Sequence, residues 1–469
     1  MSEAFDDVVR RVRERVTPGA DERERLRAVT ETVLDRAREA VADLPVEADV
    51  IQVGSTARDT WLPGDRDVDV FVRFPPSIDR EELTAYGLEV GHAVLPDGRE
   101  EYAEHPYVVG EIEGFSVDLV PCYDVETATD IRSAVDRTPF HTRYLTARLT
   151  DDLAADVRVT KQFLTAVGVY GSDLRTRGFS GYLVELLVLE HGSFRDLLEA
   201  AADWHPPVRF DPEDHGQATP ETGSPSRNDA VDEDGLAFDD PLVVVDPTDP
   251  GRNVAAALSA TNLARFQHHA RELLVDPRLD RFEPVEPDPL DASAVRAAFE
   301  TRTTTPVAIR FDAPDLVEDQ LYPQLRKSRL GLVGELDRRG FDVLRSAAFA
   351  DETVAILLEL AVARRPAIER HEGPPVHVRE HARDFYETYA DDPDVYGPFV
   401  DGDRYVVERP RAFETARGLL ESDAVFDVAL GTHVERAMVD GYEVLVGEAV
   451  AALADEFGVD LARYCSPWV

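Results

Sequence analysis

Lysine is nearly absent from this sequence of 469 residues, where it occurs only at Lys161 and Lys327 and arginine supplies the other basic side chains. Cysteine occurs only at Cys122 and Cys465, too few for a disulfide framework or a thiolate zinc cluster. No apolar run reaches the length of a membrane span, and residues 1–15 lack the apolar core of a signal peptide. These absences predict a cytoplasmic protein without a membrane partner.

Acidic residues are abundant instead. The chain holds 93 acidic and 50 basic residues, which gives a formal net charge of −43. Disorder would explain such a charge, but 43% of the residues are hydrophobic, enough to fill ordinary cores. A surface adapted to concentrated salt explains it better. Because the Debye length is only about 3 Å at 1 M salt, the charge does not exclude a nucleic-acid partner.

The length predicts about three domains, and the hydrophobic periodicity changes along the chain accordingly. The predicted helices of the first half cover residues 4–16, 21–42, 80–94, 151–170, 181–191 and 252–266. The predicted strands there cover residues 49–53, 68–74, 107–112, 115–120 and 241–246. Helices 290–299, 380–389, 412–420 and 442–457 and strands 307–311, 341–349 and 404–408 are predicted in the second half. The fold class is therefore α+β and multidomain.

Residues 210–240 are rich in Pro, Gly, Ser and acidic residues and show neither helical nor strand periodicity. They are predicted to be a flexible acidic insertion. The predicted domains are an α/β domain at 1–145, a helical central domain at 146–262 that contains this insertion, and a region at 263–469 with one large or two small subdomains.

A glycine-serine turn follows the predicted strand 49–53. Gly54 allows the backbone to turn sharply, and Ser55 is a residue type that caps helices. Free N–H groups at a helix start suit an anionic ligand such as a triphosphate.

Three aspartates follow on predicted strands. Asp67 and Asp69 are two residues apart, so their side chains lie on one face of a strand while the valines between and after them face the core. Asp118 lies between Val117 and Leu119 in a later strand. Together the three carboxylates are predicted to hold two Mg²⁺ ions.

The acidic pair alone is weak evidence. At this acidic content, chance would produce on the order of 18 acidic-x-acidic pairs in the chain. The prediction depends on the context: the Gly-Ser turn upstream, the alternation of apolar residues through the pair, and the third acid within an apolar strand.

Taken with further motifs, this segment resembles the archaeal-type (class I) CCA-adding enzymes of the polymerase-beta-like nucleotidyltransferase superfamily. The motifs that carry the resemblance lie in family order within the first 260 residues and are Gly54-Ser55 with Arg58-Asp59-Thr60-Trp61, Asp67-x-Asp69, Arg137-Thr138-Pro139-Phe140-His141, Lys161-Gln162-Phe163-Leu164, Val169-Tyr170-Gly171, Gly178 to Glu185, and Asp246-Pro247 to Ala256. The remainder of the chain resembles the family in length and layout.

The resemblance implies a polymerase-beta-like nucleotidyltransferase domain, a helical central domain and a C-terminal α+β region that binds RNA. It implies that Asp67, Asp69 and Asp118 hold the metals and carry catalysis. The residues that it places around the nucleotide are Gly54, Ser55, Arg58, Thr138, His141, Lys161, Tyr170 and Arg252, the last beside the incoming base. Two positions depart from the family: Asp59 stands where Gly is usual, and Gly251 where a second basic residue is common.

Composition supports part of this assignment. Since lysine is so rare, Lys161 on the polar face of its predicted helix is more consistent with function than with a surface role. Residues 132–148 and 158–177 each sum to +3 in a chain of −43, so positive charge is kept where phosphate would bind. The cluster Arg326, Lys327 and Arg329 is a candidate contact with the RNA backbone, or else a solvated helix end.

The predicted reaction is addition of C, C and A to the 3′ end of tRNA from CTP and ATP without a template. One metal would activate the tRNA 3′-hydroxyl and the other would neutralise the departing pyrophosphate. The alternatives are a poly(A) polymerase or oligoadenylate synthase on the same scaffold, or a noncatalytic RNA-binding protein that has kept the fold. The sequence leaves a homodimer open.

Overall fold

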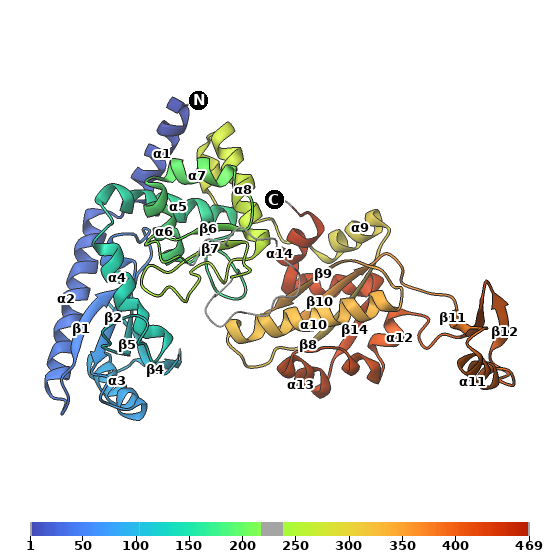
Figure 1. Cartoon of the computed structure of the whole chain (residues 1–469). Coiled ribbons are helices and arrows are strands. Elements are labelled where there is room, and N and C mark those ends of the chain that lie inside the picture. Colours follow the sequence, from blue (N-terminus) through green and yellow to red (C-terminus); the bar gives the residue numbers. More distant parts are fainter. Residues whose placement is uncertain (1, 103, 217–237, 468–469) are drawn as a thin grey trace. The chain divides into compact units, whose positions relative to one another are not determined.

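The computed structural model describes residues 2–102, 104–216 and 238–467 (Figure 1). The chain forms two compact units, Met1–Val285 and Glu286–Val469. Helices and sheets occur in both, as the predicted α+β multidomain class requires. Most of the predicted flexible insertion, 210–240, lies outside the described residues.

A mixed sheet of five strands, in the order β1-β2-β5-β4-β3, forms the centre of the first half of unit 1. Its strands are β1 (Asp49–Val53), β2 (Asp67–Phe74), β3 (Arg99–Tyr102), β4 (Pro106–Ile112) and β5 (Phe115–Tyr123). Strands β2 and β5 are parallel and the other pairs are antiparallel. The sequence predicted four of these strands and missed β3, whose short run of charged residues gives no apolar alternation.

Two helices, α2 (Ala20–Ala42) and α3 (Arg80–Val94), cover one face of this sheet (Figure 1). That face carries Val68, Val70 and Val72 of β2, all buried. Helix α3 lies close to the sheet because it has glycines there: a Cβ on Gly87 would come within 2.4 Å of Pro121. The acidic side chains of β2 and β5 therefore occupy the opposite face.

A helical layer completes unit 1. Its elements are α1 (Ser2–Val16), α4 (Thr138–Thr146), α5 (Asp151–Val167), α6 (Gly181–His191), α7 (Phe194–Ala202), α8 (Ala260–Val275) and the short parallel pair β6 (Val208–Phe210) and β7 (Leu242–Val244). Four of these helices begin at a Ser or Thr that accepts a hydrogen bond from the third following N–H, as helix caps do. The predicted core residues of α6, Leu183, Leu186 and Leu187, are buried in the shared core, as expected.

Two helix bounds in this layer differ from the prediction. Helix α5 ends at Val167, not at Tyr170, because Gly168 takes a left-handed conformation at its end. Helix α8 begins at Ala260, not at Arg252. The side-chain oxygen of Asn253 accepts hydrogen bonds from the N–H groups of Val244 and Ala255, at 2.9 Å each, and so holds this stretch as a turn.

Unit 2 is built on an antiparallel sheet in the order β14-β8-β10-β9. Its elements are α9 (Ala292–Arg302), β8 (Thr305–Asp312), α10 (Glu318–Arg338), β9 (Val343–Ala350), β10 (Thr353–Leu360), α12 (Ala416–Leu420), α13 (Thr432–Asp440), β14 (Glu443–Val446) and α14 (Ala454–Cys465). Strand β10 is buried along almost its whole length, so both faces of this sheet are covered.

The predicted helix 442–457 is wrong. Strand β14, a 3-10 helix at Gly447–Leu453 and then α14 occupy this stretch. Strand β14 pairs with β8, more than 130 residues earlier, and this contact is invisible to local periodicity. The cluster Arg326, Lys327 and Arg329 lies within α10 and not at a helix end.

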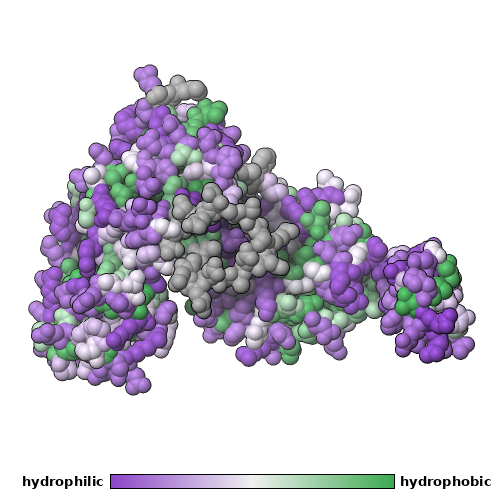
Figure 2. All heavy atoms as spheres, in the orientation of Figure 1, coloured by the Kyte–Doolittle hydropathy of each residue, from purple (hydrophilic) through white to green (hydrophobic). Residues whose placement is uncertain are grey.

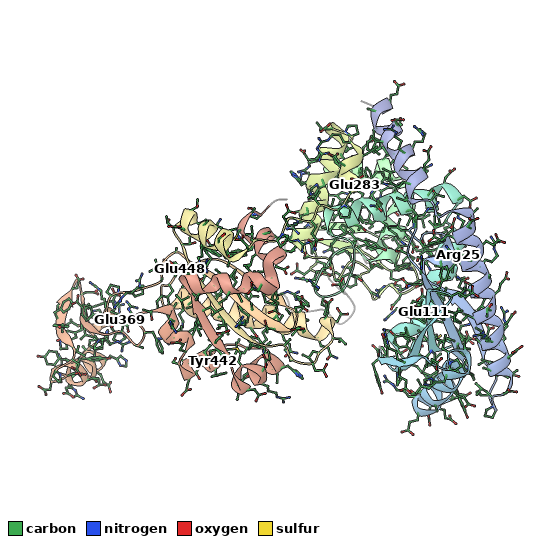
Figure 3. The ribbon with its side chains drawn as sticks, turned by 180° about the vertical axis from the view of Figure 1, so that it is seen from behind. Arg25, Glu111, Glu283, Glu369, Tyr442 and Glu448 are labelled. Atoms are coloured by element: carbon green, nitrogen blue, oxygen red, sulfur yellow. The ribbon has the colours of Figure 1, made fainter. Side chains whose placement is uncertain are left out.

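A small module of unit 2 contains β11 (Ile368–Pro375), α11 (Arg379–Tyr389), β12 (Tyr396–Asp401) and β13 (Arg404–Pro410), with the three strands in one sheet. Figure 3 labels Glu369 on this module and Tyr442 and Glu448 near the larger sheet. The module exposes large side chains, among them Tyr386, Tyr396 and Val400. Figure 2 shows some green, hydrophobic atoms on the surface of this module.

Among the described residues, every helix is too short or too polar to cross a lipid bilayer.

Candidate active site

Strand β1 ends in a turn whose backbone conformation strongly favours glycine. Gly54 has φ +78°, and a Cβ built on it would lie 1.9 Å from Oδ2 of Asp69. Glycine is thus required both by the backbone conformation and by the carboxylate packed against it. The following residues, Thr56–Arg58, form one 3-10 turn. The expectation that Ser55 caps a helix through its side chain is wrong, since no such hydrogen bond is present at this short turn.

The three predicted aspartates share the face of the sheet opposite α2 and α3. Asp69 and Asp118 are direct partners in the parallel pairing of β2 and β5, and Asp67 lies two residues along β2. Glu111, labelled in Figure 3, is two residues along β4 from Val109, the partner of Asp118, and so belongs to the same face. The register therefore brings the three carboxylates together.

These carboxylates are short of positive charge. Burial, followed by the charges of Asp118 and Asp67, raises the pKa of Asp69 to about 6. Burial, followed by the charge of Asp67, raises the pKa of Asp118 to about 6. Burial raises the pKa of Tyr107 on β4 to about 12, helped by Asp118. Repulsion of this kind between buried acids is relieved by a bound cation.

The aspartates do not already form a closed ligand cage. Within the described parts of the chain, no three His, Cys, Asp or Glu side chains converge as a formed metal centre would. Their fit to a metal therefore depends on the chemistry of the donors. Carboxylate oxygens are the ligands that Mg²⁺ prefers in proteins, and these carboxylates share one face of the sheet and carry unbalanced negative charge.

Arg58 leaves this turn and meets a buried acid. Its Nε and Nη2 atoms donate to the two oxygens of Glu185 on α6 at 3.1 and 2.9 Å, and Nη1 donates to the Thr142 hydroxyl at 3.2 Å. Glu185 is fully buried and also accepts a hydrogen bond from the Thr60 hydroxyl. The charge of Arg58 offsets a part of the rise in the pKa of Asp69, so the guanidinium lies near the acids.

Lys161 lies next to this group. The expected position on the polar face of α5 is wrong, because Lys161 is 2% exposed and donates to the carbonyl of Thr60 at 2.8 Å. Burial lowers the pKa of the ammonium, and Glu185 counters this. A Cβ on Gly181, the first residue of α6, would lie 3.3 Å from the Tyr170 hydroxyl and 3.8 Å from the Lys161 Nζ. Lys161 and Tyr170 therefore meet at the start of α6.

Asp59 does not leave an uncompensated charge beside the proposed phosphate site. It has φ +54°, a conformation that glycine adopts more easily, in keeping with the glycine that the sequence resemblance leads us to expect at this position. Its carboxylate pairs with Arg23 at 3.2 Å and with the buried Arg158 at 3.4 Å. The departure from the family pattern is thus balanced by two arginines.

His141 and Arg252 converge on a second buried acid. The Oδ2 atom of Asp246 lies 2.8 Å from His141 Nε2 and accepts a hydrogen bond from Arg252 Nη1 at 2.8 Å. His141 also stacks on Tyr182, with ring centroids 3.9 Å apart. Burial raises the pKa of Asp246, but the hydrogen bonds from His141 and Thr248 and the charge of His141 outweigh it and hold the pKa well below its usual range.

Thr138 is the first residue of α4, but its backbone N–H donates to the Val135 carbonyl and Pro139 has no N–H, so its hydroxyl is the group it can offer to a ligand. It lies at the start of the helix that also carries Thr142, the partner of Arg58.

Sequence reasoning gave no role to Glu185 or Asp246, although both lie within quoted motifs. A signal was available in each case: Glu185 is the only charged residue in the apolar run 181–189, and Asp246 follows the buried residues 242–245, of which 242–244 form β7. An acid inside an apolar run is rarely left without a partner.

Family models match three successive stretches of the chain. Their descriptions are "Nucleotidyltransferase domain" for residues 34–141, "tRNA nucleotidyltransferase, second domain" for 155–283, and "CCA-adding enzyme, C-terminal domain" for 302–447.

Curated relatives match over the whole length. A CCA-adding enzyme of Haloarcula marismortui is 64% identical and covers 100% of both chains. A CCA-adding enzyme of Halorubrum lacusprofundi is 61% identical and covers 99% of both. Among solved structures, the Cid1 poly(U) polymerase is 13% identical with a TM-score of 0.45, over 60% of this chain and 99% of its own, a similarity too low to support any argument.

Proposed function

The chain belongs to the CCA-adding enzyme family, and from this premise we propose that the residues around Gly54, Asp69 and Asp118 form its active site. The enzyme adds C, C and A to the 3′ end of tRNA from CTP and ATP, and it comes from the halophilic branch of the family. The poly(A) polymerase, oligoadenylate synthase and noncatalytic alternatives are not favoured. The observation that carries the site assignment is the direct pairing of Asp69 with Asp118 beside the Gly54 turn.

Nucleotidyltransferases of this fold depend on a metal, and we assign its binding to Asp67, Asp69 and Asp118. The metal is proposed to be Mg²⁺, with two ions. The raised pKa values of Asp69 and Asp118 fit this assignment, because a divalent cation would stabilise their ionised forms. When bound, such ions supply positive charge for the triphosphate and acidify the attacking hydroxyl. The protein itself holds the carboxylates on one rigid sheet face.

The nucleotide is proposed to lie across the Gly54 turn and the adjacent helix starts. In this proposal Gly54 and Ser55 offer backbone N–H groups, Ser55 and Thr138 offer hydroxyls, and Arg58 offers guanidinium N–H donors to the triphosphate. Lys161 and Tyr170, whose side chains meet beside the first residue of α6, are proposed to lie near the triphosphate. Arg252 is proposed to lie near the incoming base, and His141, which bonds to the same Asp246, is proposed to lie beside the triphosphate.

The rest of the chain is proposed to bind the tRNA body. We keep the division by role into 1–145, 146–262 and 263–469, while the first compact unit extends to Val285 because α8 packs in its core. A cytoplasmic location, where tRNA and nucleotides are found, and a homodimer are part of the proposal.

An incorporation assay tests the function. A tRNA that lacks its last three residues is incubated with purified protein, Mg²⁺ and each nucleotide in turn. The expected result is two C from CTP, one A from ATP after the second C, and then no further addition. Unlimited addition of A would refute the proposal and favour a poly(A) polymerase.

Replacing Asp69 by Ala tests the site. Asp69→Ala is expected to lower incorporation by at least about 10³-fold, because it removes a carboxylate shared by the proposed metals, and to leave tRNA binding unchanged. Gel-shift and single-turnover measurements separate the two effects. Asp65→Ala is the matched control, since Asp65 lies in the turn before β2 and bonds to the N–H of Leu62. Near-normal incorporation by Asp69→Ala would refute the assignment.

A further inference from the structure

Glu185 is the meeting point of side chains that are far apart in the sequence. It is fully buried in the middle of α6 and receives two hydrogen bonds from Arg58 and one from Thr60, residues 127 and 125 positions away. A buried carboxylate without partners would be costly, whereas this one is satisfied by a two-pronged arginine and a hydroxyl.

The same turn is held from two more helices. Arg58 Nη1 bonds to Thr142 on α4 at 3.2 Å, and Lys161 Nζ on α5 bonds to the Thr60 carbonyl at 2.8 Å. The segment that follows Gly54 is therefore fixed by α4, α5 and α6 at once, with Glu185 bound to two of its residues. The sheet that carries the aspartates and the helical layer are joined at this point.

The bonds of Arg58 leave part of its guanidinium available. Arginine has five N–H donors, and three of them are used by Glu185 and Thr142. The remaining donors belong to a planar group whose orientation is fixed by the two oxygens of Glu185. A fixed arginine binds an oxyanion without losing further side-chain entropy.

We propose that Glu185 is a positioning residue for nucleotide binding: it orients Arg58, directly and through its bond to the neighbouring Thr60, so that the two guanidinium donors not used by Glu185 and Thr142 meet the triphosphate. The proposal rests on the proposed function. Glu185 does not touch the nucleotide; it acts through Arg58.

The test compares Glu185→Gln with the wild-type enzyme under salt conditions in which both are folded. Gln keeps the size but removes the charge that holds the guanidinium. The KM values for CTP and ATP are expected to rise by roughly 10-fold to 100-fold, the range of effects of misplaced positioning groups, while the KM for tRNA changes less than about twofold. Glu190→Gln, an exposed position on the same helix, is the matched control and should leave all constants unchanged.

A double-variant cycle separates positioning from general stability. If Glu185 acts through Arg58, Glu185→Gln should add less than about twofold to the nucleotide KM of Arg58→Gln. If Glu185→Gln raised the nucleotide KM by the same factor in the wild-type enzyme and in Arg58→Gln, the proposal would be overturned. So would a Glu185→Gln enzyme with a lower melting temperature and an unchanged nucleotide KM, the result of a purely structural role.

Thr60→Val serves if Glu185→Gln does not fold. It removes one hydroxyl bond to Glu185 with almost no change of shape, and it should raise the nucleotide KM by roughly threefold; no change would overturn the proposal. The wild-type enzyme is assayed first for addition of C, C and A. Failure there would refute the proposed function, whereas normal wild-type activity with unaltered variants would refute only the role of Glu185.

Discussion

In the folded protein the carboxyl groups of Asp69 and Asp118 are harder to ionise than free carboxyl groups. Their pKa values, raised from 3.8 to about 6, mean that the folded protein binds these protons more tightly than the unfolded chain does. The stabilisation from this effect is full below pH 3.8 and is lost as the pH rises through about 6. At neutral pH the two ionised acids therefore weaken the fold, and a divalent cation between them would remove that penalty.

The stabilisation by Mg²⁺ should consequently depend on pH. At pH 7.5, addition of Mg²⁺ is expected to raise the melting temperature by roughly 2–4 °C, a shift equivalent to about 1 kcal/mol in a domain of this size. At pH 5, about one unit below these pKa values, Asp69 and Asp118 are mostly protonated and the shift should be much smaller. Asp69→Asn should abolish the shift at pH 7.5. An equal shift at pH 5 and 7.5, measured by thermal unfolding, would contradict the assignment of these acids.

At the scale of elements, the turn after β1 fixes the distance between the triphosphate donors and the acids. Gly54 allows the turn and lets Asp69 pack against the backbone. The short 3-10 turn that follows then directs Arg58 toward α6. A rigid strand pair and a turn without side-chain bulk are thus the elements that bring the proposed cation and phosphate sites together.

Gly54→Ala should disrupt this arrangement. Its Cβ would overlap the Asp69 carboxylate, so we expect incorporation to fall by at least about 100-fold, with a loss of stability of roughly 1–3 kcal/mol. Gly192→Ala is the control: Gly192 has φ +83° at the end of α6 with open space around it. It should lose similar stability but keep its activity. If both variants retain activity, the close packing of Gly54 against Asp69 is not needed for incorporation, and the prediction is wrong.

At the scale of the whole molecule, the net charge of −43 dominates. Figure 2 shows hydrophilic residues over most of the face it displays. Self-repulsion of such a surface is screened when the Debye length is about 3 Å, at 1 M salt, and acts over about 10 Å at 0.1 M. The repulsion opposes the compact state most strongly in dilute buffer.

Both activity and melting temperature are therefore expected to fall as KCl is lowered from about 1 M to 0.1 M. An equal osmolality of sucrose in dilute buffer is the control, because it favours compact states without screening charge. Recovery by sucrose alone, or full activity in dilute buffer, would contradict an electrostatic cause.

Strand alternation in the sequence was sufficient to place Asp67, Asp69 and Asp118 on strands with their carboxylates away from the core, because alternation is a local property with period two. It could not give the register that pairs Asp69 with Asp118, nor the bounds of residues 252–259 and 442–457, where side-chain bonds and a distant strand override local preference. The roles of the site residues remain predictions.

The sequence by itself was sufficient to recognise the family, to predict an acidic surface and to single out the three aspartates as candidate metal ligands, because composition and short motifs carry this information. Only the tertiary structure decided that Lys161 is buried, that Asp59 is balanced by two arginines, and that Glu185 and Asp246 each gather side chains from distant segments. The physical reason is that the partner of a buried charge is chosen by packing between elements more than 100 residues apart, which no local pattern records.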